Sequence, residues 1–197
     1  MEAPRERSSG SLTNRFADAL AYAHRVHADQ RRKGGSVPYI AHLLGVAALV
    51  LEDGGDEDEA IAALLHDAVE DQGGAERLDD IRRRFGERVA AIVEACTDTK
   101  EDPKPPWYQR KETHIEGFRS APPEVLRIAL ADKLYNARAI QRDRYISGEA
   151  VWSRFHAGRE QVLWYYRTLA DLFSERRPGW MAEELQRVIQ KLERPSG

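Results

Sequence analysis

Helical periodicity is the feature that most constrains what this chain can fold into. Apolar side chains recur at spacings of three and four along most of its 197 residues, and no segment shows the strict alternation of a half-buried strand. Glycine and proline interrupt the pattern at a few points, which predicts helices joined by turns. We therefore expect an all-α fold, a single compact bundle of about eight to ten helices.

The interruptions divide the chain into segments whose ends are defined to within a few residues. Thr13 or Asn14 suits the N-cap of the first helix. The predicted helices cover residues 16–27, 41–51, 57–69, 78–85, 87–97, 107–118, 123–142, 151–173 and 180–192. The predicted loops cover residues 31–38 (RRKGGSVP) and 99–106. We expect one domain over residues 13–193, an N-terminal tail at 1–12 and a C-terminal tail at 194–197.

Composition narrows the classes of partner. The chain has 30 basic and 33 acidic residues and a formal net charge of −3, so we expect neither nucleic acid nor membrane as a partner. Cys96 is the lone cysteine, which excludes an intrachain disulfide and fits a reducing compartment, the cytoplasm. No run approaches the roughly 18 apolar residues of a membrane helix. Aromatic residues near the C-terminus could serve a homodimer.

A His-Asp pair stands in an unusual setting. Residues 61–65 (IAALL) have the pattern of a buried helix, and His66 and Asp67 follow them directly. A carboxylate buried beside an imidazole is costly unless a charge such as a divalent cation compensates it. On a continuous helix, Glu70 would share one face with His66 and Asp67, and Asp71 follows directly. The alternative is a solvated helix end with a salt bridge, but the helix dipole disfavours clustered carboxylates at a C-terminus.

Two more polar residues lie inside apolar helical segments. Taken alone, His42 suits a satisfied core or capping histidine, and Asp132 suits an ion pair with Lys133 or an arginine. Together with His66 and Asp67 they offer two nitrogens and two oxygens, a set suited to Mn²⁺, Fe²⁺ or Zn²⁺ more than to Mg²⁺. Such an ion would lower the pKa of a bound water and supply hydroxide near neutral pH.

Four motifs follow one another between residues 16 and 140: QRRK at 30–33, PYIAH at 38–42, HDAVED at 66–71 and ADKLYN at 131–136. With these motifs the sequence resembles the HD-domain phosphohydrolases and, within them, the RelA/SpoT-type hydrolases of guanosine tetraphosphate, which include small alarmone hydrolases. The resemblance implies an all-helical fold and a metal that is usually Mn²⁺. It also implies removal of pyrophosphate from the ribose 3′ position of (p)ppGpp, giving GDP or GTP.

The resemblance assigns roles to nine residues of this chain. The implied metal ligands are His42, His66, Asp67 and Asp132. The implied catalytic acidic pair is Glu70 and Asp71. The implied substrate contacts are Arg32, Lys33 and Asn136. Asn136 lies four residues after Asp132 and therefore on the same helical face, which fits a shared site. Tyr39, beside the basic loop, is at least as well explained as a core aromatic.

The match to the family leaves alternatives open. Gly34 and Gly35 stand where more polar residues are usual, and glycine there either turns the chain or lets the backbone approach a phosphate. A related enzyme could instead remove the 2′-phosphate of NADPH, or act on another nucleotide. A non-catalytic nucleotide-binding or antitoxin partner is the third alternative. The length leaves no room for a synthetase domain, so we expect a stand-alone hydrolase acting on a small-molecule nucleotide.

Overall fold

The computed structural model describes residues 11–97 and 105–194, and over these ranges the chain is all-α as predicted. It forms α1 (Asn14–Val26), α2 (Ile40–Glu52), α3 (Glu57–Leu65), α4 (Ala68–Asp71), α5 (Gly74–Phe85), α6 (Glu87–Cys96), α7 (Trp107–Ser120), α8 (Pro123–Ser147), the 3₁₀ helix η1 (Gly148–Arg154), α9 (Gly158–Arg176) and α10 (Trp180–Glu193). Residues 1–10 of the predicted N-terminal tail, residues 195–197 of the predicted C-terminal tail and residues 99–104 of the predicted loop lie outside the described residues.

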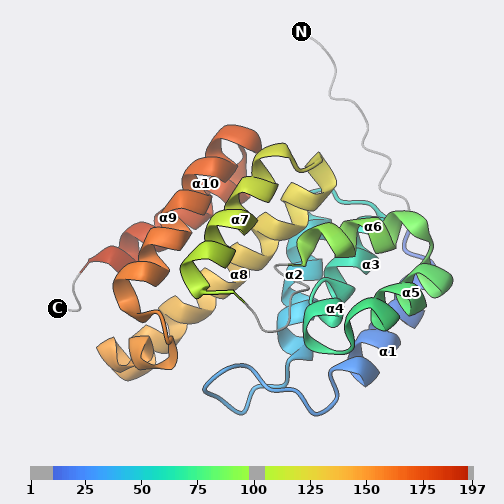
Figure 1. The fold of residues 1–197 in the computed structure, drawn as a ribbon, viewed down its shortest axis with the longest axis horizontal. Helices are drawn as coiled ribbons and strands as arrows, with labels where there is room; N and C mark the ends of the chain where they lie inside the picture. Colours follow the sequence, from blue (N-terminus) through green and yellow to red (C-terminus); the bar gives the residue numbers. More distant parts are fainter. Residues whose placement is uncertain (1–10, 98–104, 195–197) are drawn as a thin grey trace, which may run out of the picture.

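The long helix α8 is the central element of the bundle (Figure 1). It packs against α2, α3 and α6 toward the N-terminal half, and against η1, α9 and α10 toward the C-terminal half. Within the N-terminal half, α1 contacts α2 and α3, while α5 contacts α4 and α6. Helix α7 lies along α9. Among the described helices, none has the length and apolar character needed to cross a bilayer.

Local sequence explains where several helices begin. Thr13 caps α1, because its hydroxyl accepts a hydrogen bond from a backbone amide two residues later. Asp56 and Glu59 form a reciprocal capping box at the start of α3. Gly73 and Gly74 have φ angles of 126° and 55°, which only glycine adopts readily, and they separate α4 from α5. The predicted break at this glycine pair is confirmed.

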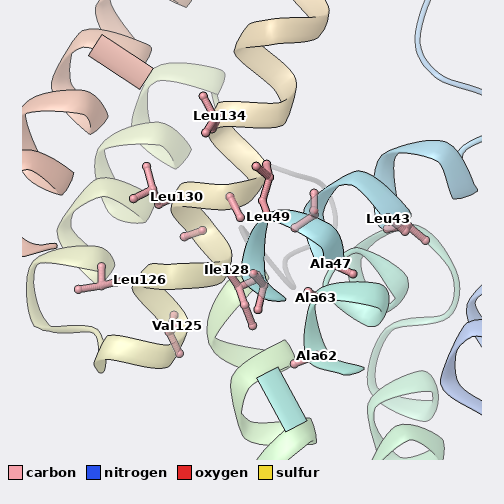
Figure 2. Packing of buried hydrophobic residues seen from close by; sticks show 14 of the residues in the cluster. Leu43, Ala47, Leu49, Ala62, Ala63, Val125, Leu126, Ile128, Leu130 and Leu134 are labelled. Atoms are coloured by element: carbon pink, nitrogen blue, oxygen red, sulfur yellow. The ribbon is translucent and has the colours of Figure 1, made fainter. Parts of the chain in front are cut away.

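The core beside the site lies between α2, α3 and α8, where Leu43, Ala63 and Leu134 are fully buried (Figure 2). Gly45 allows α2 to approach α8 closely. A Cβ atom built on Gly45 would lie 1.9 Å from the Tyr135 ring, so any other residue would force the two helices apart. This spacing sets the distance between the polar side chains that α2 and α8 contribute to the site.

One helix predicted over residues 57–69 is interrupted in the structure. Helix α3 ends at Leu65, and the chain turns at His66 and Asp67 before α4 begins. His66 Nδ1 lies 2.8 Å from the carbonyl oxygen of Ala63, and such a side chain contact to the backbone competes with helical hydrogen bonding. The uninterrupted helix predicted over residues 57–69 is therefore wrong, since His66 and Asp67 form a turn between α3 and α4.

Other boundaries also differ from prediction. The single helix predicted over residues 151–173 is two elements, η1 and α9, because Phe155 is extended and Gly158 has a φ of 73°. Helix α8 continues to Ser147, five residues past its predicted end, and α5 begins at Gly74 rather than at residue 78. The break at Phe155 shapes the wall of the cavity described below.

Candidate metal centre and adjoining cavity

Four side chains from distant parts of the sequence meet between α2, α8 and the turn that joins α3 to α4. His42 Nε2 lies 3.3 Å from Asp67 Oδ2 and 3.3 Å from Asp132 Oδ1. His66 Nε2 lies 3.1 Å from Asp67 Oδ2 and 3.7 Å from Asp132 Oδ1. Ligand atoms of His42, His66 and Asp67 all lie within 4.8 Å of one another. The structure thus brings the four residues together, while their role as metal ligands stays a prediction.

Both histidines present buried nitrogens to this point. His42 is 1% exposed and His66 is 4% exposed, and among the described residues neither Nε2 atom has a hydrogen-bond partner. The Ala63 carbonyl can only accept, so His66 Nδ1 carries a proton whether the ring is neutral or charged, and Nε2 is the nitrogen left to bind an ion. Unpartnered buried nitrogens facing carboxylates are costly unless a cation compensates them. The donor set, two nitrogens and two oxygens, therefore fits a divalent ion.

Three further side chains orient the two carboxylates. The Tyr39 hydroxyl donates to Asp67 Oδ2 at 2.6 Å. Lys133 Nζ donates to Asp132 Oδ2 at 2.6 Å, and Asn136 Nδ2 donates to Asp132 Oδ1 at 2.5 Å. The ion pair with Lys133, raised above as an alternative role for Asp132, is present, but it uses the oxygen that faces away from the imidazoles. Such outer contacts are typical of metal sites, where they hold ligands in orientation.

The electrostatics of the cluster favour positive charge at its centre. Burial would lower the pKa of His66, but the Asp67 and Asp132 carboxylates outweigh burial and raise this pKa well above its ordinary value. Burial would raise the pKa of Asp67 and Asp132, but the cationic partners, His66 and Lys133 foremost, hold both well below their usual range. Burial and Asp67 raise the pKa of Tyr39, so its hydroxyl remains a donor.

A cavity of about 320 Å³ opens beside the cluster. Arg32 Nη2 donates to Asn136 Oδ1 at 2.5 Å, and Asn136 donates to Asp132, so hydrogen bonds connect the cavity wall to the cluster. The cavity is lined by Arg32, Lys33, Tyr39, Asn136, Ala139, Ile140, Arg142, Asp143, Val151, Arg154, Phe155 and Tyr166. Aromatic and aliphatic surface beside several cations suits a flat ring that carries phosphates.

The outer wall of the cavity depends on an arginine that the motifs do not identify. Arg154 donates to Asp143 Oδ2 at 2.8 Å, and Arg142 pairs with the other oxygen of Asp143 at 2.9 Å. Gly34 has a φ of 75°, and a Cβ there would lie 2.7 Å from Arg154 Cδ. Glycine at this position therefore both turns the loop and admits Arg154, which joins the basic loop to η1.

The acidic pair lies on the short helix α4. Glu70 is partly buried, and Asp71, more exposed, accepts a hydrogen bond from Gln30 Nε2 at its Oδ2 atom, 2.8 Å away. Burial raises the pKa of Asp71, the Gln30 contact lowers it, and the Asp67 and Glu70 charges raise it, with a net rise. A carboxyl group with a raised pKa exchanges its proton closer to neutral pH.

Sequence reasoning did not identify four residues that the structure places around the site. Tyr39, interpreted more readily as core, donates to Asp67, and Lys133 pairs with Asp132. Gln30 contacts Asp71, and Arg154 forms part of the cavity wall. Tyr39 and Lys133 had a usable signal, since both stand within three residues of a predicted ligand. Arg154 had none, because its segment matches no motif.

The chain belongs to the HD domain family, whose pattern it matches over residues 19–163. HD domains are metal-dependent, and the matched segment contains all four residues of the His/Asp cluster. The family expected from the sequence motifs is therefore confirmed.

The more similar relatives are hydrolases of one kind. The chain is 39% identical over 136 residues to human guanosine-3′,5′-bis(diphosphate) 3′-pyrophosphohydrolase MESH1, covering 68% of this chain and 73% of that protein. It is 36% identical over 128 residues to the guanosine-3′,5′-bis(diphosphate) 3′-pyrophosphohydrolase of Aquifex aeolicus, covering 62% of this chain and 17% of that protein.

Two solved structures have a similar fold. One, described as a metazoan ortholog of SpoT that hydrolyzes ppGpp, superposes with a TM-score of 0.77 at 26% identity, over 93% of this chain and 98% of that chain. Another, lmo0812 from Listeria monocytogenes EGD-e, superposes with a TM-score of 0.68 at 30% identity, over 81% of this chain and all of the other.

Proposed function

We propose that this protein is a metal-dependent hydrolase that removes the 3′-pyrophosphate of (p)ppGpp, giving GDP or GTP and pyrophosphate. The observation that carries the proposal is the convergence of two imidazoles and two aspartates beside a cavity with cationic and aromatic walls. The names of the relatives, guanosine-3′,5′-bis(diphosphate) 3′-pyrophosphohydrolases, support the same substrate.

In this proposal the metal ligands are His42, His66, Asp67 and Asp132. The proposed ion is Mn²⁺, and Fe²⁺ or Zn²⁺ would suit the same donor set. When bound, the ion supplies Lewis acidity and lowers the pKa of a coordinated water to near neutrality. Tyr39 and Lys133 hold the two carboxylates ionised and oriented, so that their oxygens face the imidazoles.

Arg32, Lys33 and Asn136 are the proposed substrate contacts. The planar guanidinium of Arg32 can stack on a purine base, while the Lys33 ammonium can pair with phosphate oxygens. Asn136 lies between Arg32 and Asp132, so an asparagine contact to the nucleoside would place the ribose next to the metal ligands. Phe155, which lines the same cavity, offers a flat apolar surface for the base.

Asp71, with Glu70 beside it, is the proposed proton carrier. The reaction adds water across the bond between the ribose 3′ oxygen and phosphorus, so one proton must leave the attacking water and one must reach the departing 3′ oxygen. The raised pKa of Asp71 suits a carboxyl that takes the first proton and returns it to the leaving oxygen.

A substrate panel tests the proposal. Pure protein is incubated with Mn²⁺ and either ppGpp, pppGpp, NADPH or an ordinary nucleotide, and pyrophosphate is resolved from orthophosphate. We expect pyrophosphate from ppGpp and pppGpp, with none above background from a His66→Ala variant. Orthophosphate from NADPH alone would replace the proposal with a 2′-phosphatase. Tight binding of ppGpp without turnover in the presence of Mn²⁺ would favour a nucleotide-binding or antitoxin protein.

We also propose a cytoplasmic location for the enzyme. A single cysteine suits the cytoplasm. One domain over residues 13–193 stays a prediction, as does a homodimer. Trp180, at the start of α10, is 40% exposed and is the aromatic residue near the C-terminus that such an interface could use. Light scattering of wild type and a Trp180→Ala variant would test the dimer.

A further inference from the structure

The side chain of Gln30 connects three other residues near the acidic pair. Gln30 lies in the loop between α1 and α2. Its Oε1 atom lies 2.8 Å from Gln72 Nε2 and 2.6 Å from His27 Nδ1, and its Nε2 atom lies 2.8 Å from Asp71 Oδ2. Both ends of the amide group are therefore used, and one of them reaches a carboxylate proposed to carry the proton.

The partners determine which way the amide points. The ionised Asp71 carboxylate can only accept, so the Gln30 atom that faces it is the nitrogen, and the oxygen faces Gln72 Nε2. His27 Nδ1 then carries its proton, since it also faces that oxygen. Burial lowers the pKa of His27, which favours the neutral ring. The Gln30 nitrogen is left to donate to Asp71, and an oxygen that accepts twice strengthens that donation.

Backbone hydrogen bonds and a ring contact surround Gln30. The Gln30 amide donates to the His27 carbonyl at 3.1 Å, and the Gln30 carbonyl accepts from the Tyr39 amide at 3.0 Å. The His27 ring is 3% exposed and stacks on the Tyr39 ring, with centroids 5.1 Å apart and planes at 22°. Because Tyr39 also bonds to Asp67, the same contacts align Asp71 with the metal cluster.

Asp71 stands on an element that offers little support of its own. Helix α4 has four residues, too few for intrinsic stability, and Gly73 and Gly74 follow with positive φ angles. A hydrogen bond from outside the helix is therefore needed to restrict the Asp71 carboxylate to one rotamer.

We propose that Gln30 is a positioning residue that holds the Asp71 carboxylate toward the metal cluster for proton transfer. The expected effect on kcat rests on the proposed function, in which Asp71 carries the proton. The existence of the hydrogen bond between Gln30 and Asp71 does not depend on that function. Loss of this bond should lower kcat and leave the binding of substrate and of Mn²⁺ nearly unchanged, because Gln30 donates to neither.

The first test needs no substrate. The ¹⁵N-labelled side-chain amide of Gln30 is assigned by comparison with Gln30→Glu, and its resonances are recorded in wild type and in Asp71→Ala. A bond to an ionised carboxylate predicts a clear change in the Gln30 amide proton shifts when Asp71 is removed. Unchanged shifts would overturn the proposal, whatever the substrate of the enzyme proves to be.

The second test is kinetic. With ppGpp and Mn²⁺, Gln30→Ala should lower kcat by about ten- to a hundred-fold, the range for a hydrogen bond to a charged group, with KM within about two-fold of wild type. Gln30→Glu has nearly the same shape but repels Asp71, and should lower kcat further. Asp29→Asn, at the exposed neighbouring position, is the matched control and should match wild type.

The outcomes separate the two proposals. If wild type does not hydrolyse ppGpp but the Gln30 amide shifts change in Asp71→Ala, the proposed function is contradicted and the Gln30–Asp71 hydrogen bond is supported. Active wild type with kcat unchanged in Gln30→Ala and Gln30→Glu would contradict the positioning role alone. A fall in thermal stability that matches the fall in kcat, together with weaker Mn²⁺ binding, would mean that Gln30 is merely structural and would overturn the proposal.

Discussion

Two clusters of buried charge lie toward opposite ends of α2, which at 13 residues is about 20 Å long. Beyond its C-terminal end, Arg127 pairs with Asp53 and Glu59, and Arg177 also pairs with Asp53. We call this set the arginine lock. It joins the end of α2 to α3, α8 and the end of α9, and each of its carboxylates has a guanidinium partner.

The cluster at the N-terminal end of α2 is built differently. His42, His66, Asp67 and Asp132 converge, but both nitrogens of His42 and the Nε2 atom of His66 have no hydrogen-bond partner among the described residues. Lys133 is the cation bonded to this cluster, and it faces the outer oxygen of Asp132. The comparison shows that the ion pairs of the arginine lock join helices to one another. In the His/Asp cluster, nitrogens and carboxylates face one point without enough positive charge, and a bound cation would compensate them.

The largest expected effect is at the His/Asp cluster. His66→Ala should lower activity by on the order of a thousand-fold or more, because one ligand and its lone pair are lost. It should also abolish binding of one Mn²⁺ per chain, measured by isothermal titration calorimetry. His24→Ala, at an exposed histidine on α1, is the matched control. Undiminished Mn²⁺ binding in His66→Ala would show that the cluster is not the metal site.

The arginine lock should respond in stability rather than in metal binding. Glu59→Gln leaves Arg127 without its full partner in a buried setting, and should reduce the free energy of unfolding by about 3 kcal/mol. Urea denaturation measures this change, with Mn²⁺ affinity expected to stay near wild type. Asp79→Asn removes an exposed ion pair with Arg82 and should cost well under 1 kcal/mol. Equal losses in the two variants would remove the distinction between buried and exposed pairs.

A smaller effect is expected from the outer contacts of the metal cluster. Tyr39→Phe removes the hydroxyl that donates to Asp67 and should weaken Mn²⁺ binding by about ten-fold, the lower end of the range for such contacts. Calorimetric titration with Mn²⁺ measures it. Tyr22→Phe, which removes a hydroxyl bound to Asp80 and not to a member of the His/Asp cluster, should leave Mn²⁺ affinity unchanged. Equal Mn²⁺ affinity in wild type and Tyr39→Phe would show that the Tyr39 hydroxyl does not contribute to metal binding.

The smallest effect concerns an exposed charge cluster. A hydrogen bond from Tyr22 and contacts with Arg84 and Arg83 lower the pKa of Asp80 to about 2. A lowered folded-state pKa means that this carboxylate stabilises the fold above pH 4 and that the contribution is lost as the pH falls from about 4 to about 2.

Because solvent screens Asp80, the contribution should be below about 1 kcal/mol. Asp80→Asn should therefore show a slightly weaker decline in unfolding free energy between pH 4 and pH 2 than wild type does. A steeper decline in Asp80→Asn would reverse the assigned sign.

Much of this protein was determined by local sequence. Periodicity was sufficient for the all-α class, and Thr13 and the Gly73–Gly74 pair marked helix ends, because capping and backbone freedom act within a few residues. Four motifs were sufficient to identify the HD family. The residue types of His42, His66, Asp67 and Asp132 were enough to suggest a metal, since their chemistry does not depend on the path of the chain.

Tertiary structure alone decided how those residues meet. The helix that periodicity predicts over residues 57–69 breaks at His66, where the imidazole faces Asp132 of α8 and the ring of His42 of α2. The contact of Arg154 with the loop at Gly34, and that of Gln30 with Asp71, join segments 120 and 41 residues apart. Patterns along a chain report on neighbours within a few residues, whereas these contacts depend on how α2, α4 and α8 pack, which no local pattern encodes.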